Sequence, residues 1–245
     1  MPESNRNHLI APAVVLGIAL LLSAAIFAKV QRDNRRDSQC IEATGSAKRM
    51  IISDFGTCVV LLSGTGTQLA DAYRDLQRQK PQVLAYLQSK GFSSTSIKLS
   101  APVLTTNYER NGNGYETTRI ISYTYTQEIK LESSDVRAIE TLSLEITGLV
   151  EQGLAISINP PQYFYTKLAD LKIEIQAEAA ADAALRARRI AEATGRVLGP
   201  LQSARMGVLQ ITPRNSNDIA DYGMNDVSSI EKEITAVVNG EFIIN

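Results

Sequence analysis

Histidine and cysteine are scarce in this sequence. Among 245 residues there is one histidine, His8, and there are two cysteines, Cys40 and Cys58. The lone histidine stands beside the first apolar run, which excludes a Ser-His-Asp triad or a multi-histidine metal site in the folded part. The cysteines lack CxxC spacing, so neither a redox dithiol nor a zinc site is indicated. A structural disulfide between them and two free thiols remain as alternatives.

An excess of positive charge is also missing. The sequence has 25 basic and 26 acidic residues, which gives a formal net charge of -1. Proteins that neutralise many phosphates carry a basic surface, so we expect no nucleic-acid partner. With 44% hydrophobic and 21% charged residues, the chain has the composition of a folded protein that is long enough to bury a core.

A long apolar run stands near the amino terminus. Residues 9–28 carry no charge, and 20 residues at 1.5 Å each span about 30 Å, the thickness of a hydrocarbon core. We therefore assign residues 1–8 to a short tail, 9–30 to a transmembrane anchor in the lipid bilayer, and 31–38, which are polar and without periodicity, to a linker. The alternative is a signal peptide cleaved near residues 23–25, but the apolar region of such peptides is normally shorter.

Charge next to this run bears on its orientation. Arg6 precedes the anchor, whereas Lys29, Arg32, Arg35 and Arg36 follow it, so a positive-inside count places the large domain in the cytoplasm. An even number of cysteines early in the body would instead suit an oxidising compartment. These residues alone leave the orientation open.

Strands and helices are interleaved through residues 39–245, which we take as one domain. Alternation predicts strands and helical spacing predicts helices, in the order ββαββαβαββ. We expect an α+β fold, with helices covering one face of a mixed sheet. The expected strands lie within 41–63 and at 97–108, 119–131, 155–158, 201–211 and 231–244; the expected helices begin near 69, near 134 and at 167, the last ending at 194.

Several local features give sharper expectations. The Ser53-Asp54 pair predicts the turn of an opening hairpin. The run Asn111-Gly112-Asn113-Gly114 predicts a second hairpin, between the strands at 97–108 and 119–131. Pro81 should kink or split the first helix of the body, and Ser133 or Ser134 can cap the second. In the long third helix, Ile190 is expected to face inward with the other apolar residues of its stripe.

Candidate chemistry is weak. The Gly64-Thr65-Gly66 turn opens a helix, but Leu69 stands where a dinucleotide fingerprint needs its third glycine, so we expect no cofactor. Glu174, Glu178 and Asp182 share a helical face, as paired catalytic carboxylates would. A solvated face explains them better, because Asp182 stands four residues before an arginine, the favourable order for a surface ion pair.

Two features favour assembly instead. Tyr163, Phe164 and Tyr165 form an aromatic cluster that could be either buried or an assembly patch. Residues 231–244 alternate with Phe242 on one face, and at a sheet edge this strand would offer unpaired backbone groups to a second copy. We therefore name Tyr163, Phe164, Tyr165 and Phe242 as a candidate surface for homo-oligomers.

Several residue strings are shared with a known family. The opening segment Thr44-Gly45-Ser46-Ala47 with Ser53-Asp54 follows the family's pattern, although Ala47 and Ser53 depart from its second glycine and its proline. The match is closer in the alanine-rich helix over 177–193, in the following Thr194-Gly195, and in the strings at 164–173, 203–207 and 229–233. On these residues the chain resembles the membrane-anchored branch of the SIMPL-domain family of bacterial envelope proteins.

The resemblance has several implications. It implies a single-pass inner-membrane protein with its C-terminal domain in the periplasm, and larger oligomers in some relatives. It implies no reaction and no catalytic residues, so a non-enzymatic binding or assembly module is expected, with a role in stress tolerance by family analogy. The alternatives are an envelope hydrolase using paired carboxylates, and a small-ligand carrier with a cavity beneath residues 212–229. The protein partners stay unknown.

Overall fold

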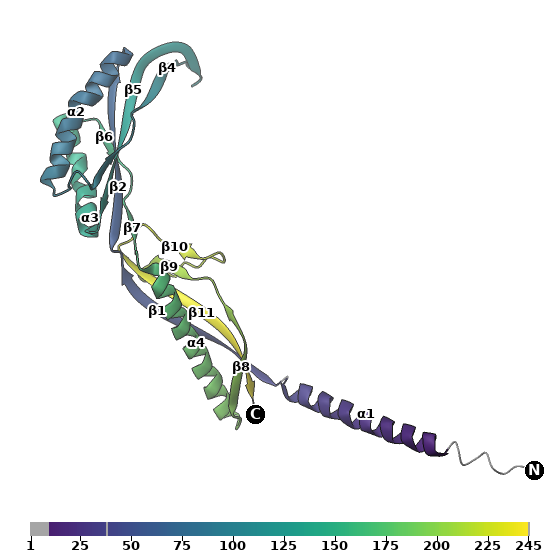
Figure 1. The fold of residues 1–245 in the computed structure, drawn as a ribbon. Helices are drawn as coiled ribbons and strands as arrows, with labels where there is room; N and C mark the ends of the chain where they lie inside the picture. Colours follow the sequence, from purple (N-terminus) through teal and green to yellow (C-terminus); the bar gives the residue numbers. More distant parts are fainter. Residues whose placement is uncertain (1–9, 38, 245) are drawn as a thin grey trace, which may run out of the picture. The chain divides into compact units, whose positions relative to one another are not determined.

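The structure is a computed structural model that describes residues 10–37 and 39–244 (Figure 1). The described residues divide into two compact units. Unit 1 contains the residues up to Ala47, Ile173–Val208 and those from Thr235 onward, and unit 2 contains Lys48–Lys172 and Leu209–Ile234. Residues 39–245, which we expected to be one domain, are described below with reference to these two units.

The first helix, α1 (Ile10–Asp37), contains the apolar run. Its segment Val14–Gln31 is long and apolar enough to cross a membrane, and the rest of the described chain does not cover it. Residues 31–37, which we expected to be an irregular linker, continue this helix. The expected tail at 1–8 and residue 38 lie outside the described residues.

The sheet of unit 2 is built on two long antiparallel strands, β2 (Phe55–Gly66) and β5 (Glu116–Ser133). The shorter strands pair along their outer edges, β3 and β4 with β5, and β6 and β7 with β2, all antiparallel. Their bounds are Ile97–Leu99 for β3, Val103–Arg110 for β4, Ile156–Ile158 for β6 and Gln162–Phe164 for β7. The hairpin expected around residues 111–114 is confirmed as the β4–β5 pair.

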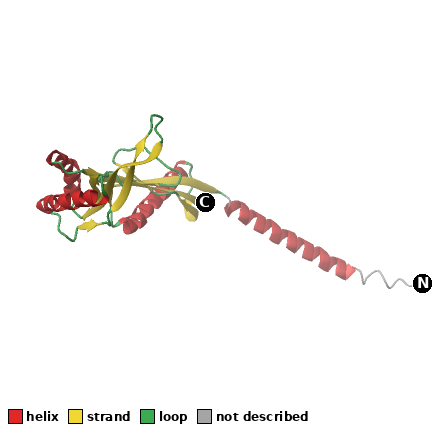
Figure 2. Cartoon of the chain, turned by 90° about the horizontal axis from the view of Figure 1, so that it is seen from above, coloured by secondary structure: helices red, strands yellow, loops and turns green. Residues whose placement is uncertain are grey.

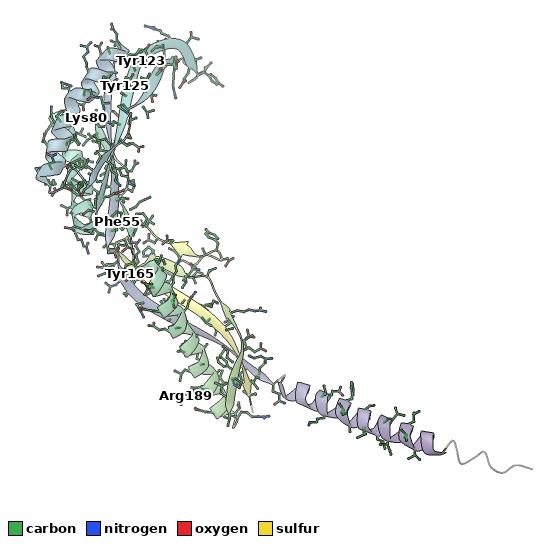
Figure 3. All side chains as sticks on the ribbon, in the orientation of Figure 1. Phe55, Lys80, Tyr123, Tyr125, Tyr165 and Arg189 are labelled. Atoms are coloured by element: carbon green, nitrogen blue, oxygen red, sulfur yellow. The ribbon has the colours of Figure 1, made fainter. Side chains whose placement is uncertain are left out.

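Two helices, α2 (Leu69–Ser89) and α3 (Val136–Glu145), cover one face of this sheet (Figure 1). Alternate residues of β2 face them, and α3 continues as a 3₁₀ helix over Ile146–Gln152. Tyr125, labelled in Figure 3, packs edge-on against Tyr73 of α2 with ring centroids 5.5 Å apart. The core includes Cys58, Val60, Leu62, Leu76, Val83, Leu87, Ile129, Leu131, Ile139, Leu142 and Ile146.

Two expectations about these helices need correction. The first helix is not split, because α2 runs unbroken through Pro81, which lies on its exposed side. The cap of α3 is Asp135, whose carboxylate accepts hydrogen bonds from the backbone N–H groups of Arg137 and Ala138 at 3.1 and 3.0 Å. The Ser133 hydroxyl instead accepts from the N–H of Asp135, because Ser133 lies two residues before the capping position.

The second sheet is built on β11 (Glu231–Ile244), which pairs with β1 (Cys40–Ile52) on one side. Its other side pairs with β8 (Leu198–Met206) and β9 (Gln210–Pro213). β10 (Met224–Asn225) runs parallel to β9, whereas β8 is antiparallel to β11. The terminal strand is therefore interior, so the sheet-edge position that self-association through this strand would require is not found.

The expectation of an opening hairpin is also wrong. β1 and β2 follow each other in the chain but pair in different sheets. At the turn, the Ser53 N–H donates to the carbonyl oxygen of Ile230 at 2.9 Å, and the Asp54 N–H donates to that of Phe164 at 3.0 Å. The turn residues bind other segments, so the chain passes from one sheet into the next instead of folding back.

The long helix α4 (Leu168–Ala193) lies along β1, β11 and β8 (Figures 1 and 2). Its buried residues repeat every four positions: Leu171, Ile175, Ala179, Ala183, Ala187 and Ala191. Ile190 is 46% exposed, so its expected inward orientation is wrong. Alanine dominates this stripe because the helix lies unusually close to the sheet.

Glycines in the strands bring helix and sheet backbones into contact. A Cβ atom on Gly45 of β1 would lie 2.1 Å from the backbone nitrogen of Ala183 in α4. In unit 2, a Cβ atom on Gly64 of β2 would lie 2.3 Å from the backbone nitrogen of Leu76 in α2. Neither position has room for a side chain.

An aspartate reinforces each of these contacts. The N–H of Ser46, which follows Gly45, donates to the Asp182 carboxylate at 2.9 Å. The N–H of Thr65, which follows Gly64, donates to the Asp75 carboxylate at 3.3 Å. Each aspartate precedes by one position the helix residue whose nitrogen contacts the glycine, so both units use the same construction.

We predict that Gly45→Ala and Gly64→Ala each destabilise their own unit by at least about 2 kcal/mol, because the new methyl group must displace helix backbone. Hydrogen exchange of the full-length protein in detergent should show lost protection in α4 for the first variant and in α2 for the second. Gly148→Ala is the matched control, since a Cβ there meets nothing within 4 Å. Unchanged exchange in both strand variants would contradict this account of the packing.

Candidate functional site

The aromatic residues named from the sequence lie mostly inside the units. Tyr163 is 4% exposed and belongs to the core of unit 2, whereas Phe242 is 6% exposed and belongs to that of unit 1. Phe164 and Tyr165 are half-buried. Tyr163 and Phe242 therefore pack within the protomer, and neither offers its ring to a second copy.

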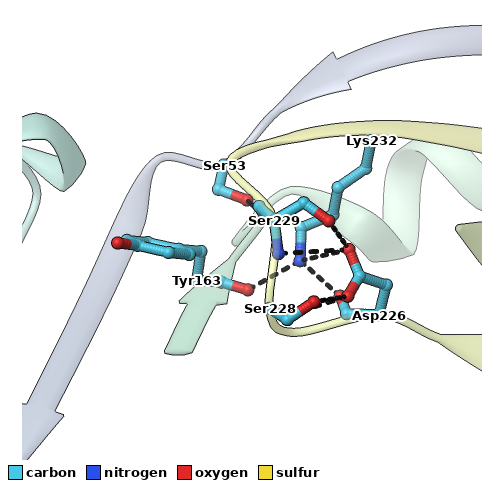
Figure 4. Close-up of polar contacts among 6 residues, drawn as sticks. All are labelled: Ser53, Tyr163, Asp226, Ser228, Ser229 and Lys232. Atoms are coloured by element: carbon cyan, nitrogen blue, oxygen red, sulfur yellow. Dashed lines mark hydrogen bonds and ion pairs between the residues drawn. The ribbon is translucent and has the colours of Figure 1, made fainter. Parts of the chain in front are cut away.

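Beside Tyr163 lies a buried charged cluster (Figure 4). Lys232 of β11 is only 2% exposed. Its ammonium group donates hydrogen bonds to the carbonyl oxygens of Tyr163, at 2.8 Å, and of Asp226. The same nitrogen lies 3.9 Å from the Asp226 carboxylate. Burial lowers the pKa of Lys232 because the charged form loses its water, while the carboxylate partly opposes this shift.

The Asp226 carboxylate is held by two serines. It accepts from the backbone N–H and the hydroxyl of Ser228, at 2.8 and 2.7 Å. It also accepts from the backbone N–H of Ser229, at 3.3 Å, and from its hydroxyl. Burial raises the pKa of Asp226, but the serine hydrogen bonds and the charge of Lys232 outweigh it and bring the pKa below its ordinary value.

The geometry of this cluster is that of a structural site. A lysine that activates a serine must accept the hydroxyl proton. Here the serine hydroxyls donate to Asp226, and the Lys232 ammonium donates to backbone carbonyls. The adjacent cavity, beneath the 212–229 segment, has a volume of about 50 Å³. Ligand pockets usually measure about 300–1,000 Å³, so this cavity is too small to hold such a ligand.

A second polar site lies on the sheet of unit 1. The Cys40 thiol donates to one oxygen of Glu241 at 2.8 Å, and the Ser203 hydroxyl donates to the other at 3.0 Å. Ser203 and Glu241 belong to the lining of an open hollow of about 230 Å³, which we call the polar trough. Its lining residues are Glu42, Ser203, Arg205, Asn239, Gly240 and Glu241. It is the larger of the two sites and faces solvent.

The electrostatics of the polar trough do not favour a general acid. Hydrogen bonds from Cys40 and Ser203 lower the pKa of Glu241, whereas a general acid needs a raised one. The same bond raises the pKa of the Cys40 thiol. Asp182, one of the paired carboxylates named from the sequence, is held by Ser46 and by Arg186 at 2.8 Å. Within the described residues, no three His, Cys, Asp or Glu side chains gather to hold a metal ion.

Both cysteines are free thiols in the structure, so the disulfide offered as one alternative is not formed. Cys40 lies in unit 1 and Cys58 in the core of unit 2, where burial raises its pKa to about 11. The hairpin between β1 and β2 that would have paired their strands is absent. Cys58 acts as a small apolar side chain, and Cys40 acts as a hydrogen-bond donor.

Sequence reasoning missed the Lys232–Asp226 cluster. A signal was present, because Lys232 occupies the same alternating positions of β11 as Ile234, Ala236 and Val238, which are buried. A lysine in such a series predicts a buried charge that needs a carboxylate, and Asp226 stands six residues before it.

The comparisons with known proteins identify a family but no activity. The model of the SIMPL family, described as a protein of unknown function (DUF541), matches residues 41–242. No match is found among the curated proteins. A crystal structure described as a "putative amidohydrolase/peptidase from Burkholderia cenocepacia" is 16% identical and covers 58% of this chain. The match covers 35% of that chain, with a TM-score of 0.20, so it carries no argument about fold or activity.

We predict that Lys232→Met lowers the free energy of unfolding of unit 2 by about 3–5 kcal/mol, because it leaves the Asp226 carboxylate and two carbonyl oxygens without their buried partner. Urea unfolding of the full-length protein checks this. Lys48→Met, which removes an exposed ion pair with Glu233, is the control and should cost less than about 1 kcal/mol. Equal losses in the two variants would show that the buried cluster is not needed for stability.

Proposed function

Because this chain belongs to the SIMPL family, we propose that it is a single-pass, membrane-anchored protein of the cell envelope that works by binding or assembly. The family model covers residues 41–242 of the body but not the apolar helix before it. Membership supports an envelope-type protein, and α1 adds a candidate anchor. The proposed activity is to present the body, as a non-enzymatic module, at a membrane surface.

The observation that carries this proposal is the covalent connection between anchor and body. α1 ends at Asp37 and β1 begins at Cys40, so two residues separate a helix able to cross the bilayer from the first strand of the sheet. With so short a connection, the body stays at the membrane surface. Anchoring also confines all copies to one plane, which raises their effective concentration for one another.

For the orientation, we propose that the body lies in the periplasm and the short amino-terminal tail in the cytoplasm. The resemblance to anchored SIMPL proteins supports this side. The basic residues that follow the apolar run favour the opposite side, although Asp33 and Asp37 dilute their charge. The orientation therefore needs a direct test.

The chemistry of the described sites favours binding or assembly over catalysis. The carboxylates of the sites described above, Asp182, Asp226 and Glu241, accept hydrogen bonds that hold strands and turns together. Groups used in this way are not available to take or give protons at a substrate. The open face of unit 1 and its edge strands offer surface instead.

We predict that protease added to spheroplasts digests the body while a cytoplasmic marker protein stays intact. Digestion is expected because a periplasmic body has no membrane between it and the protease. The measurement is an immunoblot against a tag at the carboxyl terminus. Full protection, with digestion only after lysis, would place the body in the cytoplasm.

We predict that the full-length protein in mild detergent is an oligomer at tens of micromolar. Native mass spectrometry checks the number of copies, and a variant that lacks residues 1–36 should dissociate at higher concentrations than the full-length chain held in lipid vesicles, because only the bilayer confines copies to one plane. A full-length protein that stays monomeric in native membranes, detergent and after chemical crosslinking would contradict the assembly function.

A further inference from the structure

The sheet of unit 1 ends in two strands whose outer sides are unpaired within the described chain. β1 and β8 lie on opposite sides of β11, and each pairs with it along one edge. Every residue from 200 to 206 is exposed, although these residues form a regular strand. An exposed edge of this length is a template for pairing with another strand.

The open edge of β8 carries free backbone groups in a regular series. The Gly207 N–H donates to the Val237 carbonyl oxygen at 2.9 Å, and the register continues as Arg205 opposite Asn239. Residues 203, 205 and 207 therefore direct their backbone groups at β11. The alternate residues, Ala204 and Met206, direct their N–H and C=O groups away from it.

The open part of β1 is shorter. Asp182 of α4 accepts from the Ser46 N–H at 2.9 Å, so this position of the edge is already occupied. The stretch from Cys40 to Thr44 carries no such cover in the described contacts. A partner strand of three to five residues fits there, which matches the exposed stretch of β8.

Direction and charge suit these two edges to each other. Side-chain contacts pair Cys40 with Glu241 and Lys48 with Glu233, so β1 is antiparallel to β11. β8 is also antiparallel to β11, so β1 and β8 are parallel. Arg205 of β8 and Glu42 of β1 line the same polar trough and have opposite charges.

We propose that copies of this protein associate head to tail through unit 1, with β8 of one copy added as a parallel strand beside β1 of the next. The inference rests on the proposed assembly function and names its surface and its partner, a second copy of this chain. Arg205 of one copy then lies next to Thr44 and within reach of Glu42 of its neighbour. The polar trough continues from copy to copy.

The membrane explains why the contact is head to tail. Copies anchored in one bilayer have the same polarity, so neighbours are related by rotation about the membrane normal. Such a rotation brings unlike edges together and generates rings when it closes. Leu201 and Met206, which are 52% and 65% exposed, lie on the strand that becomes interior.

Cysteine crosslinking in native membranes tests the contact. In a Cys40→Ser, Cys58→Ala background, Thr44→Cys combined with Arg205→Cys should give a ladder of disulfide-linked oligomers, and each single cysteine should give none. Within one copy the two positions are two strand spacings apart, about 9.5 Å, beyond the roughly 7 Å Cα limit for a disulfide. A dimer from Arg205→Cys alone would show like edges pairing and would overturn the head-to-tail contact.

A charge exchange tests it in the otherwise unaltered full-length chain. Arg205→Glu and Glu42→Arg should each weaken oligomers about tenfold, and the double exchange should restore them to within about threefold. Arg189→Glu on α4, an exposed arginine paired with Glu192, is the matched control and should change nothing. Equal weakening by all variants without restoration would overturn the contact.

The outcomes separate the two proposals. Oligomers that persist in native mass spectra without the ladder and without charge restoration would leave the assembly function standing and reject this surface. Monomers under every condition would reject both. A ladder with restoration supports both, and circular dichroism of each variant confirms that a loss of oligomers does not come from unfolding.

Discussion

The close contact between strand glycines and helix backbone is the constraint on which both units depend. Gly45 and Gly64 let α4 and α2 lie directly on their sheets, and no side chain of any size fits between them. The aspartates that accept from the next strand N–H fix each helix along the strand as well as against it. Alanine at the contact positions of α4 follows from the same closeness. These few contacts thus fix where each helix lies along the strand, how close it lies to the sheet and how it is rotated about its own axis.

One consequence is that each sheet is covered on one face only. In unit 1, α4 lies over the face that carries Gly45, and the opposite face carries the polar trough. A one-sided sheet of three strands exposes much of its backbone at its two edges. Asp182 fixes α4 and also covers the β1 edge at Ser46. It leaves the rest of that edge open.

Local patterns in the sequence predicted the elements well and their pairing poorly. The β4–β5 hairpin and the stripe of α3 followed from Asn-Gly turns and helical spacing, which depend on neighbouring residues. The separate pairing of β1 and β2 depends on contacts of Ser53 and Asp54 with Ile230 and Phe164, far away in the chain. The Lys232–Asp226 cluster was missed for the same reason, because burial of a lysine is decided by three segments together.

These constraints bear on what the proposed anchor would contribute. A parallel pair of short edge strands is a weak contact, and parallel pairing is slightly less stable per residue than antiparallel pairing. In solution such an edge would pair promiscuously or not at all. When all copies are confined to one plane with one polarity, only unlike edges meet, and a weak contact repeated around a closed ring becomes sufficient. In the proposed assembly, the apolar helix and the open edges of unit 1 act together, since neither would produce a defined assembly without the other.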